Sequence, residues 1–314
     1  MSEYKFIDLF AGIGGMRIAF EDVGCKCVFS SEWDDKACQT YEANFGEHPE
    51  GDITKIDASI IPDFDILVAG FPCQPFSIIG DREGFEHETQ GTLFFDIERI
   101  LREKRPRAFL LENVRNLTAH NKGQTFKVIL NHLNCLNYNV YWKVLNALDF
   151  GLPQKRERII IVGFLDDVPS FQFPTGVPQS DKKKLEDILE SENEVDSKLY
   201  VNPIIRDRRM MSMKQHPVEP YVTHENVAGT VTPHPYFCAL RAGGSANYLL
   251  VNNVRRPSPR EMLRVQGFPD TFKVVVNYTT IKKQTGNSVP VPMIRAVAKN
   301  IVDALDGVTK WKIQ

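Results

Sequence analysis

The stretch KFIDLFAGIGGMRIAFEDVG, residues 5–24, decides the fold. Residues 5–10 have the pattern of a short buried strand, a glycine-rich turn follows, and residues 16–23 have the period of a helix that Gly24 closes. Such a turn lets a ligand approach the backbone closely at a helix N-terminus. The stretch therefore predicts the start of an open α/β sheet with a ligand site at its carboxyl edge. A nicotinamide-dependent oxidoreductase would need a third glycine where Arg17 stands, which weakens that alternative.

Acidic residues recur where the next predicted strands begin or end. Residues 27–31 predict a second strand, and Glu32 follows it about 20 residues after the glycines, where nucleotide-binding folds place an acid for ribose hydroxyls. Trp33 offers a face on which an adenine ring can stack, and Asp52 precedes the next strand. Each of these residues alone is more often a solvated loop side chain. Their recurrence along the sheet favours a cofactor pocket.

The stretch GFPCQPFS, residues 70–77, follows an apolar run at 64–69 that predicts a third buried strand. It places Cys73 in the turn after that strand, where open α/β sheets carry their chemistry, and the prolines around it stiffen the backbone. A rigidly held thiol is a candidate nucleophile, although a structural cysteine in a proline turn explains the stretch alone equally well. The polar segment 80–91 after it predicts a lid, or else a plain connector.

Charged residues flank two later strands. The buried strand predicted at 109–111 stops at Glu112, and a carboxylate there is costly unless it is paired or used, which makes Glu112 a candidate general acid. A helix N-cap or a local salt bridge is the alternative. Arg156 and Arg158 stand two residues apart at the entrance of the strand 159–164, so they point to the same side and can contact one polar ligand. A salt-bridge ladder on an edge strand would explain the arginines as well.

Composition places the chain among ordinary globular proteins. It has 314 residues, of which 42% are hydrophobic and 25% charged, enough for one large domain and a small one. There is no uncharged apolar run long enough to cross a bilayer and no secretory signal pattern at the start, so a cytoplasmic location without membrane attachment is expected. The 6 cysteines lack metal-site spacing, so no metal is expected. A net charge of -2 gives no bulk support for a nucleic-acid partner, which must rest on local clusters.

A second, smaller domain is predicted after Pro174, where the alternation of strands and helices fades. This region carries a basic cluster, followed by the glycine-rich segment 241–245. Arginines and glycines in loops suit contacts with a nucleic-acid groove, and we expect the cluster to lie across a cleft from Cys73, although such clusters are usually solvated faces. A helix opening at Pro259 and a last helix at 291–305 follow. The cluster consists of Arg206, Arg208, Arg209 and Lys214.

In these motifs the chain resembles the bacterial cytosine-5 DNA methyltransferases of restriction-modification systems. The matching segments, in order, are FIDLFAGIGG, SEWD, GDIT, GFPCQPFS, QGTLFFD, ENV, LPQKRERI, RPSPREMLRVQGFPD and QTGNSVPVP. The catalytic segments are most similar to those of the small enzymes that methylate GCGC. The resemblance implies an α/β, Rossmann-like S-adenosylmethionine-dependent fold over residues 1–175, completed by 271–314. A target-recognition domain with its hinge is implied at 176–270.

The resemblance also implies roles for the residues. Cys73 is expected to attack C6 of a flipped-out cytosine, Glu112 to hold the N3 and N4 edge and supply a proton, and Arg158 to hold O2. Arg156 is expected to brace Glu112 or the backbone. The cofactor is S-adenosylmethionine, which leaves as S-adenosylhomocysteine, with no metal. Its expected site consists of Phe10, Ile13, Gly15, Glu32, Trp33, Asp52, Ile53, Pro72, Leu93, Asn287 and Ser288.

Two departures limit the resemblance. Many relatives have an arginine where Gln90 stands, and the Thr-Leu pair of the recognition region is at best Thr230-Val231, so no target sequence carries over. Two rivals remain open: a methyltransferase of transfer RNA, whose Cys-Phe-Thr segment is absent here, and a DNA-binding regulator without turnover, which would not need Cys73, Glu112 and Arg158 together. The expected partner is double-stranded DNA, met by a monomer, with a cognate restriction endonuclease acting separately.

Overall fold

A computed structural model describes residues 3–72, 93–166, 168, 171–214 and 217–313. Four features of the sequence lie outside the described residues: Cys73, Pro75, Gln90 and the segment 80–91. The predicted nucleophile and the predicted lid therefore stay predictions.

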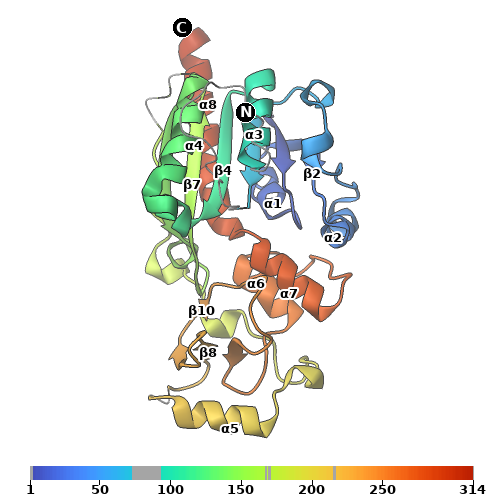
Figure 1. The fold of residues 1–314 in the computed structure, drawn as a ribbon, viewed down its shortest axis with the longest axis vertical. Coiled ribbons are helices and arrows are strands. Elements are labelled where there is room, and N and C mark those ends of the chain that lie inside the picture. Colours follow the sequence, from blue (N-terminus) through green and yellow to red (C-terminus); the bar gives the residue numbers. More distant parts are fainter. Residues whose placement is uncertain (1–2, 73–92, 167, 169–170, 215–216, 314) are drawn as a thin grey trace.

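A six-stranded sheet forms the centre of the larger part of the molecule (Figure 1). Its strand order is β2-β1-β3-β4-β7-β5, in which β2, β1, β3 and β4 run parallel and β7 is antiparallel to both of its neighbours. The predicted strands are confirmed to within a few residues, because near-continuous apolar runs mark strands that are covered on both faces. The strands are β1 (Lys5–Leu9), β2 (Lys26–Ser31), β3 (Ile66–Gly70), β4 (Ala108–Val114), β5 (Asn139–Asn146) and β7 (Glu157–Phe164).

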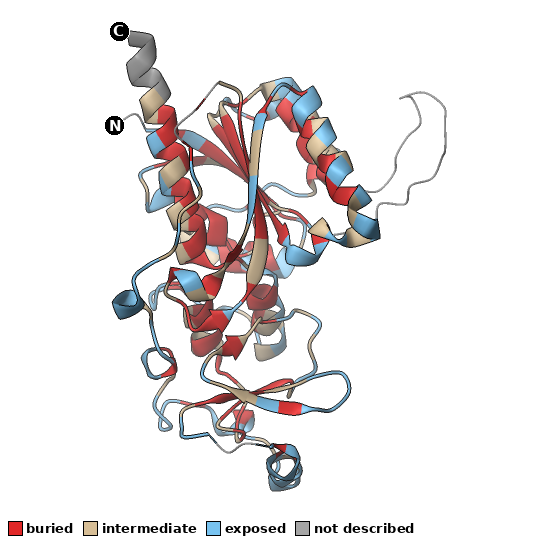
Figure 2. Ribbon diagram, turned by 90° about the vertical axis from the view of Figure 1, so that its left-hand side faces the viewer, coloured by how far each residue is buried: buried red, intermediate tan, exposed pale blue. Residues whose placement is uncertain are grey.

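Helices cover both faces of this sheet. Side chains such as Phe6 and Leu110 pack on one face against α1 (Gly15–Glu21) and α8 (Val291–Ile313). Their neighbours in the strands, such as Ile7 and Leu111, pack on the other face against α3 (Leu93–Lys104) and α4 (Gln124–Cys135). This alternation follows from the two-residue period of a strand. Figure 2 shows the buried strands between the flanking helices. The α/β fold class predicted from the sequence is confirmed.

A smaller unit, residues 197–255, lies at the other end of the molecule (Figure 1). It contains α5 (Pro203–Ser212) and a three-stranded sheet of β8 (Val222–Glu225), β9 (Val231–His234) and β11 (Leu249–Val251), in the order β11-β8-β9. The strand β10 (Phe237–Cys238) reaches back and pairs in parallel with β6 (Gln154–Lys155). Helices α6 (Pro259–Gln266) and α7 (Tyr278–Asn287) lie between the small unit and the large sheet (Figure 1).

Three helices were not predicted from the sequence: α2 (Asp35–Phe45), α5 and α7. These helices are rich in polar residues, so their helical period of apolar positions is weak in the sequence. Side chains that precede them supply their N-caps: Asp34, for example, accepts hydrogen bonds from two backbone N–H groups of α2. The short 3-10 helices are Ile53–Lys55, Ala58–Ile60, Arg115–Thr118, His120–Gly123, Ala147–Phe150, Gln179–Asp181, Leu185–Asp187 and Ser197–Leu199.

The expected position of the basic cluster, across a cleft from Cys73, stays a prediction, because Cys73 lies outside the described residues. Helix α5 lies at the end of the molecule away from the large sheet, with α6 and α7 in between (Figure 1). Arg209 is fully buried, Arg208 pairs with Glu225, and Arg206 pairs with Asp207. Carboxylates of the small unit therefore neutralise the three arginines of the cluster. The sequence did not reveal the pairing with Glu225, because the residues that meet there in the fold are not adjacent in a recognisable pattern.

Candidate active site

Glu32 closes the turn that follows β1. Its Oε2 accepts a hydrogen bond from the Gly12 N–H at 2.8 Å, and its Oε1 accepts from the N–H groups of Trp33 and Asp34 at 2.9 and 2.8 Å. These contacts fix the carboxylate between the glycine turn and the start of α2. Each carboxylate oxygen carries two lone pairs, so Oε2 retains acceptor capacity for a hydroxyl group of a ligand.

Trp33 and Asp52 lie next to Glu32, as the sequence predicts. Trp33 is 77% exposed, which is unusual for so large an apolar side chain. A backbone bridge between Ser31 and Glu50 places Asp52 beside the end of β2. Burial acts to raise the pKa of Asp52, but hydrogen bonds from the hydroxyl and N–H groups of Thr54 outweigh it, so the pKa lies below its usual value. Asp52 is therefore a fixed anion that caps a 3-10 helix.

The C-terminal segment closes the other side of the glycine turn. A methyl group added to Gly15 would lie 2.9 Å from Ser288 Oγ and 3.0 Å from Val289, so a larger residue there would force these side chains to shift. Helix α7 is tied to α2 by Gln284, which bonds to Thr40 and to the Lys36 carbonyl. Asn287, at the end of α7, is exposed. The structure thus brings Gly15 and Ser288 together although they are far apart in the sequence.

The remaining predicted cofactor residues divide into two groups. Ile13 and Ile53 are each 2% exposed and pack into the core, so neither residue presents much surface to a ligand. Phe10 has a left-handed backbone with φ of 56°, a strained conformation for a residue other than glycine, and it is partly exposed at the turn. Pro72 is exposed just after β3, and Leu93 is partly exposed at the start of α3.

Glu112 and Arg158 form an ion pair at the end of β4. Glu112 is 7% exposed, and its Oε1 lies 2.7 Å from Arg158 Nε. The N–H direction does not make this contact a hydrogen bond, so Oε1 has no hydrogen-bond donor among the described residues. Glu112 pairs in register with Gly70, the last residue of β3, and the Asn113 side chain donates to the Phe71 carbonyl at 2.9 Å. Glu112 therefore stands beside the strand that leads into Pro72.

Arg156 takes the second of its two expected roles. It is 1% exposed, and its guanidinium donates to the backbone carbonyls of Leu240, Gly286 and Ser288. No carboxylate forms an ion pair with it in the described part of the chain. It braces backbone, and its bonds do not go to Glu112.

Three polar residues at or beside this site were missed in the sequence. Asn113 links β4 to β3, and Gln154 alternates with Arg156 and Arg158 along one strand direction, a period-two signal that would have placed it on the same side. Asp8 is completely buried in β1, where burial raises its pKa to about 8 against the opposing charge of Arg17. Neither oxygen has a well-aligned donor among the described residues, although the Arg17 N–H lies near enough to lower the pKa slightly.

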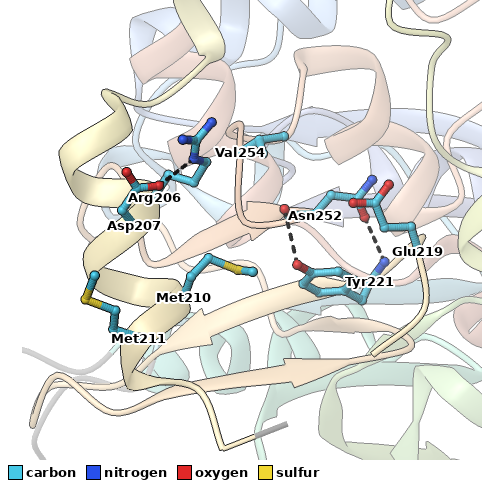
Figure 3. Close-up of a pocket in the computed structure, with 8 residues that line it drawn as sticks. All are labelled: Arg206, Asp207, Met210, Met211, Glu219, Tyr221, Asn252 and Val254. Carbon is cyan, nitrogen blue, oxygen red and sulfur yellow. Dashed lines mark hydrogen bonds and ion pairs between the residues drawn. The ribbon is translucent and has the colours of Figure 1, made fainter. Parts of the chain in front are cut away.

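A separate cavity of about 420 Å³ lies in the small unit, between α5 and its sheet (Figure 3). Met210, Met211 and Tyr221 contribute to its wall, and Tyr221 is held by Asn252 through its N–H at 3.0 Å and its hydroxyl at 3.3 Å. Of the described residues that line it, none was predicted for catalysis or cofactor binding. This cavity is not the candidate active site.

Among the described residues, no group of histidines, cysteines and carboxylates has the arrangement to hold a metal, and none of the helices is long and apolar enough to span a membrane. The sheet order, the strand-end acids and the buried Glu112–Arg158 pair are typical of α/β enzymes whose site lies at the carboxyl edge of the sheet.

Comparisons with known proteins identify the family. The model of the C-5 cytosine-specific DNA methylases matches residues 4–303, and the chain belongs to that family. It is 56% identical to the Type II methyltransferase M.NgoBI of Neisseria gonorrhoeae, over 94% of this chain and 92% of the relative. It is also 56% identical to M.HaeII of Haemophilus aegyptius, over 99% and 96%. The chain is an enzyme that methylates cytosine in DNA at C5, and the family uses S-adenosylmethionine.

The fold agrees with solved structures. The crystal structure of S. pombe Dnmt2 methyltransferase superimposes with a TM-score of 0.74 at 20% identity, covering 97% of this chain and all of that one. At this identity the likeness concerns the fold alone.

Proposed function

We propose that this enzyme methylates one cytosine within a short, specific duplex sequence through a covalent bond between Cys73 and C6 of the base. The observation that carries the proposal is the Glu112–Arg158 pair, buried at the end of β4 beside the strand that leads to Cys73. A carboxyl group and a guanidinium in contact can hold two neighbouring polar edges of one pyrimidine ring.

We assign the cofactor site to the edge formed by β1, β2 and the end of α7. Glu32 would accept hydrogen bonds from the ribose hydroxyls, and the exposed ring of Trp33 would stack on the adenine. Gly15 and Ser288, which lie against each other, would form part of the pocket wall. The remaining wall would come from the residues predicted in the sequence. When bound, S-adenosylmethionine supplies a methyl group activated by a positively charged sulfur.

The residues then divide the chemistry. C5 of cytosine is a poor nucleophile, and attack of the Cys73 thiolate on C6 forms an S–C6 bond that makes C5 electron-rich. Glu112 protonates N3 as this bond forms, and Arg158 holds O2. After C5 gains the methyl group, it loses its proton to a base, and the electron pair of that C–H bond expels Cys73 as a thiolate when the S–C6 bond breaks. N3 then returns its proton to Glu112. A base inside a duplex cannot be reached in this way, so the cytosine must be flipped out.

We assign target recognition to residues 176–270 and catalysis to residues 1–175 with 271–314. The small unit lies beyond α6 and α7 from the large sheet, and its strand β10 pairs with β6, which leads into β7 of that sheet. This link would let the small unit hold DNA against the catalytic edge. We place the enzyme in the bacterial cytoplasm, where a monomer protects host DNA from a separate restriction endonuclease.

Trapping the covalent intermediate tests this proposal. Duplex DNA with 5-fluorocytosine at the target should bind the enzyme irreversibly when S-adenosylmethionine is present, because fluorine cannot leave C5 as a proton does. The complex should survive denaturing electrophoresis. Cys73→Ala should abolish it, whereas Cys135→Ala, which changes an exposed cysteine on α4, should not. A trapped complex with Cys73→Ala would disprove the assignment of the nucleophile.

A further inference from the structure

Arg156 joins two segments that are far apart in the chain. Its Nη1 donates to the carbonyl of Leu240 at 2.9 Å, on the side of the small unit. Its Nη2 donates to the carbonyls of Gly286 at 3.0 Å and Ser288 at 2.5 Å, at the end of α7. Because the N–H groups of the planar guanidinium have a rigid arrangement, Arg156 fixes the distance between Leu240 in the small unit and Ser288 in the wall assigned to the cofactor.

Gln154 strengthens the same joint. Its Oε1 accepts from the Leu240 N–H at 3.2 Å, and its Nε2 donates to the Val265 carbonyl and to Gln266 Oε1. Gln266 in turn donates to the Thr285 carbonyl at 2.6 Å. Both backbone polar groups of Leu240 are thus held by side chains of the large unit, and the same network continues into α6 and α7.

Close packing leaves the joint little freedom. A methyl group added to Gly286 would lie 2.3 Å from the Ala242 backbone nitrogen, so segment 240–245 rests directly on α7. Lys282, also on α7, bonds to the carbonyls of Gly244 and Ser245 in the same segment, and the Arg241 N–H donates to the Tyr248 hydroxyl at 2.8 Å. Movement of this segment and movement of residues 286–288 are therefore linked.

The charge of Arg156 makes the joint sensitive to position. Burial lowers the pKa of Arg156 to about 9, and the positive charge of Arg158 adds to that effect, but the group remains charged at neutral pH. Its hydrogen-bond acceptors among the described residues are all backbone carbonyls. A buried cation without hydrogen-bond acceptors is strongly disfavoured. A shift of segment 240–245 or of residues 286–288 would therefore leave the buried charge of Arg156 without acceptors.

We propose that Arg156 is a positioning residue that couples DNA binding to cofactor binding. When the bound cofactor holds Ser288 in place, Arg156 transmits that constraint to Leu240 and to the segment that joins the small unit. When DNA holds the small unit in place, Arg156 transmits the constraint in the opposite direction, from Leu240 to Ser288. The inference rests on the proposed function, since it uses Ser288 as cofactor wall and the small unit as DNA reader. Coupling of this kind is reciprocal and is typically worth about 5-fold to 150-fold in affinity.

The test measures the Kd of a duplex carrying the methylated sequence, by fluorescence anisotropy, with and without saturating S-adenosylhomocysteine. We expect the wild-type Kd to fall at least about fivefold when S-adenosylhomocysteine is bound. In Arg156→Lys the ratio should fall below about twofold, because an ammonium group is a point donor that cannot span both segments. Gln154→Met leaves the charge of Arg156 in place and should reduce the ratio of the two Kd values only in part. This variant tests the coupling if Arg156→Lys does not fold.

Arg209→Lys is the matched control, since Arg209 is an equally buried arginine whose bonds all stay within the small unit. It should raise both Kd values together and leave the ratio unchanged. The inference is overturned if the wild type shows no coupling, if Arg156→Lys keeps the wild-type ratio, or if Arg209→Lys loses it to the same extent. Failure of the wild type to bind S-adenosylhomocysteine or to methylate DNA would instead overturn the proposed function.

Discussion

The large sheet and the small unit are held together in different ways. Side chains of β4 and β7 such as Leu110, Ile160 and Val162 are completely buried among apolar neighbours from two helices. In the small unit, α5 buries only Arg209, whose guanidinium bonds to Asn253, Glu225, Thr223 and the Asn247 carbonyl at 2.6 to 3.0 Å. The large sheet is held by many weak apolar contacts, whereas α5 is held to the rest of the small unit mainly through one polar centre.

This difference fits what each region has to do. Apolar packing tolerates the loss of a methyl group, because each contact contributes little. A buried polar network stabilises one orientation and penalises others, since each unsatisfied group is costly. The small unit can therefore fix the orientation of α5 and of the turn after β8 without a large core.

Removing Arg209 should have the largest effect on this comparison. We expect Arg209→Met to lower the free energy of unfolding by about 3 kcal/mol, because it leaves Thr223, Asn253 and the Asn247 carbonyl without their donor. The value is at the low end for a broken buried pair, since the Glu225 side chain is 23% exposed and water can reach it. Urea denaturation measures the change.

Ile161→Val, in the buried sheet, is the control for that experiment and should cost only about 1 kcal/mol. Equal losses in the two variants would contradict the contrast between a polar centre and a distributed core.

A smaller effect is expected at Asp8, the polar exception inside the apolar sheet. Burial raises its pKa to about 8 in the folded state, well above the unfolded value of 3.8. The folded state therefore binds the proton more tightly, so its contribution to stability is full below about pH 4 and is lost as the pH rises through 8. Asp8→Asn should remove this loss, which we expect to be about 2 kcal/mol after water and Arg17 relax around the ionised form.

Unfolding midpoints of wild type and Asp8→Asn at pH 5, 6.5 and 8 measure that difference. The Asp63→Asn variant, which changes a fully exposed aspartate, should follow the wild type at every pH. If the gap between wild type and Asp8→Asn does not widen with pH, Asp8 is not the buried acid described above.

Sequence predicted the sheet far better than the small unit, for a physical reason. The strand predicted at 109–111 has a continuous apolar run, and Glu112 stands out because a carboxylate after a buried strand is costly. The three carbonyls that receive Arg156 carry no side-chain signal and come from positions more than 80 residues away. The pairing of Arg208 with Glu225 and the inward turn of Arg209 likewise depend on tertiary contacts.

Bisulfite sequencing of a plasmid treated with the purified enzyme and S-adenosylmethionine tests the central claim most directly. We expect 5-methylcytosine at one position of a short sequence wherever that sequence occurs, and a rate at least about 100-fold lower for Glu112→Gln, which cannot supply the proton. A plasmid left unmodified while transfer RNA in the same reaction is methylated would contradict it.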